Sequence, residues 1–149
     1  DRLIEAVKTC KFKKIQSISM NLKRYEKSFE KITDTFEVTH LNLRFDNDKC
    51  SNLIPIPCKK LVTKTCTHLK FSAQNDNDVS RFLNRYFKFF SELRFIKCSG
   101  NLKKGLDLRK FPKLEKFSQN VQNSAALSLI HILIGPNLKK IKLNGYWNS

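Results

Sequence analysis

Apolar residues recur along the chain in the order L-x-x-L-x-L, where L stands for any apolar residue and x for any residue. Six copies of this pattern begin at residues 15, 38, 66, 93, 114 and 138, which are 23, 28, 27, 21 and 24 residues apart. The copy that begins at Leu138 is the clearest, whereas the copy that begins at Leu114 has polar Gln119 in its third apolar place. Because alternating apolar and polar residues favour a strand with one buried face, each copy predicts one short β-strand.

Several segments outside these strands carry apolar residues at helical spacing. They predict helices over residues 22–33, 78–90 and 125–133, and a further helix over residues 1–7. The third of these ends before Gly135 and Pro136, a pair that stops a helix. Residues 102–111 have room for only one or two helical turns.

The strand motif, its spacing and the helical segments between the strands together resemble the leucine-rich repeat family. The resemblance covers residues 12–146 and implies an α/β solenoid, with a curved parallel sheet on its concave face and helices on its convex face. It implies a single domain of about six repeats over residues 1–149, as part of a longer solenoid. The long, irregular repeats look most like the intracellular repeats that accompany F-box proteins. A compact α+β domain with a ferredoxin-like sheet stays open as the second interpretation.

The pattern also predicts which side chains face away from the core. Within each copy the first, fourth and sixth positions are expected to point inward, and the third, fifth and seventh to point outward from the sheet. The outward positions are Ser17, Ser19, Asn21, His40, Asn42, Arg44, His68, Lys70, Ser72, Phe95, Lys97, Ser99, Lys116, Ser118, Asn120, Lys140, Lys142 and Asn144. None of these residues is acidic, although the chain contains 13 Asp and Glu.

The composition indicates a folded and strongly basic protein. The chain has 149 residues, of which 40% are hydrophobic and 12 are Phe, enough to fill the core of one domain. The 29 Lys and Arg against 13 Asp and Glu give a formal net charge of +16, which attracts acidic partners. A composition rich in Lys, Asn, Phe and Ile also follows from AT-rich coding without selection for a ligand, and this alternative stays open. No apolar run is long enough to span a membrane, so no membrane partner is expected.

The cysteines lack the spacing of a metal site. There are five of them, an odd number, without a C-x-x-C pair or the paired Cys and His spacing of zinc fingers. We therefore expect free thiols, no bound metal and no cofactor, at Cys10, Cys50, Cys58, Cys66 and Cys98. The chain shows no secretory signal and no N-x-Ser/Thr sequon, which favours a cytoplasmic or nuclear location.

No pattern in the sequence supplies catalytic machinery. A nucleophile with its base, paired carboxylates, a metal set and a glycine-rich phosphate loop are all missing. His40 and His68 follow a threonine in the shared sequence Thr-His-Leu and occupy equivalent outward positions, so their rings are expected to lie close together. Because Cys66 is expected to face the core, this pair predicts surface contacts rather than a metal site. The sequence predicts a protein that is not an enzyme.

Phe95 is the one aromatic residue in the outward positions, and basic residues flank it. Aromatic and basic groups together supply contact area and orientation in protein interfaces. The predicted partner-binding residues are His40, Asn42, Arg44, His68, Lys70, Phe95, Lys97, Lys116, Lys140 and Lys142.

These residues predict a protein–protein interaction scaffold that binds an acidic partner on its basic concave face. The likeness to F-box-associated repeats implies the substrate-recognition part of a ubiquitin ligase adaptor. The alternative is binding of RNA or a ribonucleoprotein through the same basic residues. The sequence does not predict the oligomeric state.

Overall fold

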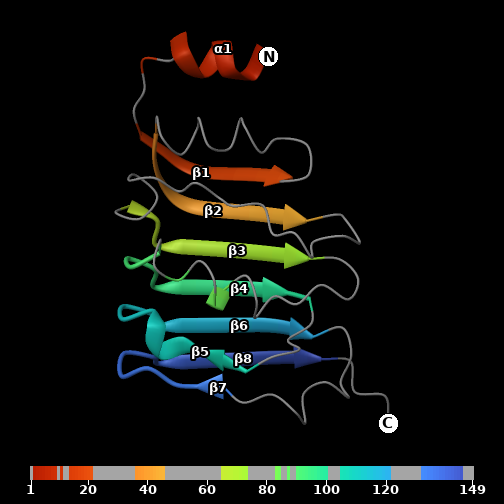
Figure 1. Ribbon diagram of the computed structural model, residues 1–149, viewed down its shortest axis with the longest axis vertical. Helices are drawn as coiled ribbons and strands as arrows, with labels where there is room; N and C mark the ends of the chain where they lie inside the picture. The colour runs from red at the N-terminus through yellow and green to blue at the C-terminus, as the bar shows by residue number, and fades with distance from the viewer. Residues whose placement is uncertain are drawn as a thin grey trace.

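The computed structural model describes residues 2–9, 11, 14–21, 36–45, 65–73, 83–84, 87, 90–100, 105–121 and 132–145. Its main feature is a parallel sheet of six strands (Figure 1). The strands lie in the order β1 (Lys14–Asn21), β2 (Glu37–Phe45), β3 (His68–Ala73), β4 (Phe95–Ser99), β6 (Lys116–Val121) and β8 (Lys140–Gly145). Each copy of the sequence pattern therefore contributes one strand, and copies that are neighbours in sequence are neighbours in space.

Strand pairing keeps equivalent positions of the pattern side by side. The fourth positions form one row across the sheet, made of Ile18, Leu41, Leu69, Ile96, Phe117 and Ile141. The sixth positions form a second row, made of Met20, Leu43, Phe71, Cys98, Gln119 and Leu143. The register expected from the sequence is confirmed in every strand of the sheet.

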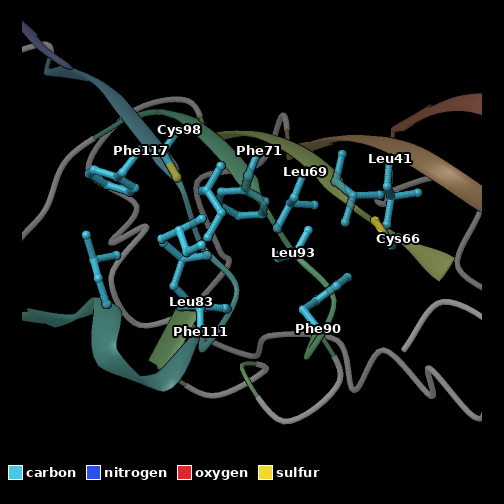
Figure 2. Packing of buried hydrophobic residues seen from close by; sticks show 14 of the residues in the cluster. Leu41, Cys66, Leu69, Phe71, Leu83, Phe90, Leu93, Cys98, Phe111 and Phe117 are labelled. Atoms are coloured by element: carbon cyan, nitrogen blue, oxygen red, sulfur yellow. The ribbon is translucent and has the colours of Figure 1, made fainter. Parts of the chain in front are cut away.

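The inward positions of the inner copies make the core (Figure 2). Their side chains are at most 3% exposed at Val38, Leu41, Leu43, Cys66, Leu69, Phe71, Leu93, Ile96, Cys98, Leu114 and Phe117. Segments between the strands supply further buried residues, among them Leu83, Phe90 and Phe111, which Figure 2 shows facing the strand residues. One copy cannot bury its own apolar side, so each strand depends on its neighbours.

The short elements outside the main sheet confirm one predicted helix. Helix α1 (Arg2–Thr9) corresponds to the helix expected over residues 1–7, and it lies beyond β1 at the end of the sheet (Figure 1). The helix expected over residues 22–33 lies outside the described residues. Of the helix expected over residues 78–90, the structure describes Leu83 and Asn84 as helical.

The prediction of a helix over residues 125–133 is wrong at the C-terminal end of that range. Strand β7 (Ile132–Leu133) pairs in parallel with β5 (Leu106–Asp107), in a second sheet of two strands. A β-branched residue suits this strand, and Ile132 packs against the core from it. The part of the predicted helix before residue 132 lies outside the described residues.

The turn that follows β7 packs closely on the chain after β5. A Cβ atom added to Gly135 would lie 3.4 Å from the backbone of Leu108 and of Arg109, in the 3-10 helix η2 (Leu108–Lys110). This one turn is the only helical structure within residues 105–111, in agreement with the short segment expected over residues 102–111. The described residues thus form mostly parallel sheet with few helices, an arrangement of α/β type.

Gln119 is a polar residue in the otherwise apolar row of sixth positions. Its side chain is 0% exposed, and its Nε2 donates a hydrogen bond of 2.6 Å to the carbonyl oxygen of Gly100. Gly100 has a φ of 134°, a conformation that favours glycine, and its N–H donates to the carbonyl oxygen of Asn120 at 3.1 Å. The copy that begins at Leu114 therefore joins the ends of β4 and β6 by hydrogen bonds, at a position where the other copies place an apolar side chain.

Burial of the fourth-position row predicts different costs for the same substitution in two strands. Ile96→Ala is expected to lower the free energy of unfolding by about 2–5 kcal/mol, because it leaves a cavity at a side chain that is 0% exposed. Ile141 occupies the equivalent position but is 36% exposed, so Ile141→Ala is expected to cost about 1 kcal/mol or less. Urea unfolding followed by circular dichroism measures both values. Equal losses in the two variants would contradict the difference in burial.

Candidate functional site

All ten predicted partner-binding residues lie at outward positions of the six-stranded sheet, on what we call the outer face. The third positions align as Ser17, His40, His68, Phe95, Lys116 and Lys140. The fifth positions align as Ser19, Asn42, Lys70, Lys97, Ser118 and Lys142. Arg44 belongs to the next row, between Asn21 and Ser72. The structure thus brings residues from five strands together on one face.

Three rings of the third-position row contact one another, and we call them the aromatic row. The rings of His40 and His68 stack, with centroids 4.1 Å apart and an interplanar angle of 16°. The ring of Phe95 is tilted by 41° against that of His68, with centroids 5.6 Å apart. Neighbouring strands lie about 4.8 Å apart, so ring contact follows directly from the register.

Threonine hydroxyl groups orient both histidine rings. The Oγ1 of Thr39 donates a hydrogen bond to the carbonyl oxygen of Gln16 at 2.8 Å and lies 2.9 Å from Nδ1 of His40. Since its one proton is already used, the Thr39 oxygen accepts from the histidine, and His40 carries its proton on Nδ1. The Oγ1 of Thr67 lies 2.9 Å from Nδ1 of His68 and makes a longer contact of 3.4 Å with the carbonyl oxygen of Thr39. A ring that carries its only proton on Nδ1 leaves Nε2 as a hydrogen-bond acceptor.

A shallow depression opens beside the aromatic row. Its volume is about 350 Å³, and its lining residues are His68, Arg94, Phe95, Glu115 and Lys116. Glu115 forms ion pairs with Lys139 at 3.0 Å and with Arg94 at 3.8 Å. The hydrogen bond from Lys139 and the charges of its basic neighbours hold the pKa of the Glu115 carboxyl below its ordinary value. The acid in this depression is therefore ionised and already paired.

Acidic and basic residues are separated on the sheet. Three acids at the N-terminal ends of the strands pair with bases of a neighbouring copy: Glu37 with Lys14 at 3.7 Å, Glu92 with Lys113 at 2.6 Å, and Glu115 as described. Among the described residues, no acid pairs with the lysines of the outer face, which are Lys70, Lys97, Lys116, Lys140 and Lys142. Within the described residues the outer face therefore carries lysines that form no ion pair, and Lys116 among them is near enough to Glu115 to lower the pKa of its carboxyl.

The environment of His68 disfavours its charged form. Partial burial lowers the pKa of His68 most, and the nearby charges of His40 and Lys116 lower it further. Protonation of the stacked pair would place like charges on adjacent rings. The neutral form of His68 is thus favoured in a row that has lysines as neighbours.

The thiol next to the aromatic row is inert. Cys66 points into the core, where its Sγ lies 3.5 Å from the carbonyl oxygen of His68, and burial raises the pKa of this thiol to about 12. Burial also raises the pKa of Cys98, and both thiols are free. Cys10, Cys50, Cys58 and His131 lie outside the described residues. Within the part of the chain that the structure describes, no three His, Cys, Asp or Glu residues are grouped as a metal site would need.

No family model, curated protein or solved structure matches this chain. The resemblance to leucine-rich repeats therefore rests on the repeat pattern and stays a prediction. None of the described helices is long and apolar enough to cross a membrane.

The second position of each copy contributes to the site in a way that the sequence analysis missed. Thr39 and Thr67 orient the histidines, and Arg94 and Glu115 line the depression. All four directly precede an outward residue in the sequence. The row of second positions could have been found from the sequence, because charges alternate at its equivalent residues Arg94, Glu115 and Lys139.

The lowered pKa of His68 predicts a pH dependence of stability. The folded protein takes up this proton at lower pH than the unfolded chain does, so stability falls as the pH drops below the ordinary histidine pKa and levels off below the folded-state value. His68→Gln is expected to flatten the profile of unfolding free energy against pH in this range. In an NMR titration, His40→Gln and Lys116→Gln should each raise the His68 pKa, and Lys97→Gln serves as the control. A wild-type His68 pKa at or above the ordinary value would refute the assigned environment.

Proposed function

We propose that this protein is a non-catalytic protein–protein interaction module that binds an acidic segment of a partner on its outer face. The observation that carries the proposal is the aromatic row, which lies among lysines without acidic partners in the described residues. Phe95 is half-buried, so part of its ring is available for apolar contact. Aromatic anchors with a charged rim are typical of protein interfaces.

The packing of the rings favours a protein partner over single-stranded RNA. Proteins that bind single strands without sequence preference stack bases on exposed ring faces. Here His40 covers one face of the His68 ring, and Phe95 lies against the other. Lysine side chains bind carboxylates and phosphates alike, so the preference for a protein partner rests on the covered ring faces.

The finer architecture belongs to the same proposal. We infer that the sheet is the concave face of a leucine-rich repeat solenoid whose helices cover the convex face, in a single domain over residues 1–149. The spacing of the six copies and their in-register parallel pairing support this interpretation. Such a protein would act as an intracellular scaffold in the cytoplasm or nucleus. As the substrate-recognition part of a ubiquitin ligase adaptor, it would bind its substrate through the outer face.

A peptide selection followed by two matched variants tests the outer face. Twelve-residue random peptides displayed on phage are expected to yield binders that combine acidic residues with an apolar residue. For a synthetic peptide of that kind, Phe95→Ala should weaken binding about 30-fold, equivalent to about 2 kcal/mol. Lys97/Lys116→Ala should mainly slow association at low salt, since exposed charges steer the encounter. Biosensor kinetics at two salt concentrations measure these effects.

The control variant is Lys8/Lys11→Ala, which removes the same charge from exposed residues in α1 and just after it. It should leave the kinetics unchanged. A mixed-sequence single-stranded RNA is expected to bind weakly and to be released at roughly physiological salt. Tight RNA binding at that salt which Lys97/Lys116→Ala abolishes, together with no enriched peptide, would put the RNA function first.

A further inference from the structure

The rings of His40 and His68 form a pair on the outer face that can take up protons. Their centroids lie 4.1 Å apart in a stack, and the ring of His68 also contacts that of Phe95. Histidine is the side chain whose ordinary pKa lies closest to neutral pH, whereas lysine and arginine stay charged there. Among the described residues of this face, the two histidines are therefore the groups whose charge changes on mild acidification.

The threonine contacts determine which ring nitrogen is available to a ligand. Nδ1 of His40 lies 2.9 Å from Oγ1 of Thr39, and Nδ1 of His68 lies 2.9 Å from Oγ1 of Thr67. Within the described part of the chain, neither Nε2 atom has a hydrogen-bond partner. A charged histidine carries a proton on both ring nitrogens. In the charged form each Nε2 is therefore a donor for an acceptor group of a partner.

The surroundings of the pair disfavour positive charge on it. The charged residues described on β1, β2, β3, β4 and β6, or directly before these strands, are Lys14, Glu37, Arg44, Lys70, Arg94, Lys97, Glu115 and Lys116. Both acids of this set, Glu37 and Glu115, are already paired with basic residues. Partial burial and the charges of His40 and Lys116 lower the pKa of His68. In the free protein the pair therefore has basic neighbours and no unpaired described acid to stabilise an added proton.

A carboxylate bound beside the pair would reverse this preference. It would accept a hydrogen bond from Nε2–H and offset the repulsion that Lys116 exerts on the charged ring. Hydrogen bonds between charged groups are roughly twice as strong as those between neutral groups. Binding and protonation are reciprocal, so a ligand that favours the protonated pair is bound more tightly once the pair is protonated. The affinity for an acidic ligand is therefore linked to pH.

We propose that binding of an acidic segment to the outer face is coupled to proton uptake by the His40–His68 pair, so that mild acidification tightens binding and a rise in pH releases the segment. The inference rests on the proposed function and adds the regulation of the same site. The proton comes from solvent and goes to Nε2 of one ring, because a second proton would place like charges on rings that stack at 4.1 Å. Acidification also removes charge from the carboxylates of the segment, which acts in the opposite direction.

A defined acidic peptide tests the coupling. The probe is Gly-Ser-Glu-Glu-Leu-Glu-Glu-Phe-Glu-Glu-Gly-Ser with blocked ends, labelled with tetramethylrhodamine, whose fluorescence does not change with pH in this range. Fluorescence anisotropy at equal ionic strength is expected to show at least about threefold tighter binding at about pH 5.5 than at about pH 7.5. Calorimetry in two buffers with different heats of ionisation should show uptake of up to about one proton per bound peptide.

Histidine variants locate the proton. His40/His68→Gln removes both titrating rings, and the ratio of its affinities at the two pH values is expected to fall to one or below. His131→Gln is the matched control, since His131 is the third histidine of the chain and lies outside the described residues. It should keep the wild-type ratio. Circular dichroism at both pH values checks folding, and His40/His68→Phe, which keeps two rings in the row, replaces a double Gln variant that does not fold.

An NMR titration of the wild-type protein supplies a second measurement that needs no variant. The bound peptide is expected to raise the pKa of His68 above its value in the free protein, because the carboxylates stabilise the charged ring. A His68 pKa that the peptide leaves unchanged or lowers would overturn the coupling.

The outcomes separate this inference from the function on which it rests. Equally tight binding at both pH values, or the wild-type ratio retained in the double variant, would overturn the coupling and leave the outer-face function standing. A ratio lost in His131→Gln would also overturn it, since the titrating group would then lie elsewhere. Absence of binding at both pH values, together with no peptide enriched on phage, would refute the proposed function and this inference with it.

Discussion

One hydrogen-bond arrangement, repeated at the N-terminal ends of β4, β6 and β8, fixes the register of the sheet from β3 to β8. The carbonyl oxygens of Thr67, Arg94 and Glu115 each accept two backbone N–H groups from the next copy, at 2.8–3.1 Å. Each of these residues occupies the second position, directly before the outward residues begin. A slip of one residue would turn the apolar rows outward. The paired N–H groups and the buried rows therefore specify the same register, and both faces of the sheet follow from it.

The chemistry of the outer face is a consequence of this register. Because equivalent positions lie about 4.8 Å apart, residues that are 21 to 28 positions apart in the sequence become direct neighbours. The His40 and His68 rings stack for this reason, and Glu115 reaches both Arg94 and Lys139. Among the described residues, Glu37, Glu92 and Glu115 are thereby paired at the N-terminal ends of the strands, while the lysines farther along the strands form no ion pair.

The sheet could be predicted because each strand is marked by one short copy of the L-x-x-L-x-L pattern. Each copy indicates which of its residues face inward, so the outward position of Phe95 and the contact of the two histidines followed from the sequence. Strand β7 could not be predicted in this way, because the apolar run before Gly135 has no period that separates a buried strand from a helix. The roles of Thr39 and Glu115 depend on neighbouring copies, which one copy of the pattern does not encode.

The apolar side chains of each strand are buried by the strands of neighbouring copies. The same residue type therefore differs in exposed fraction between the inner strands and β8. Isoleucine is core at position 96 and exposed surface at position 141.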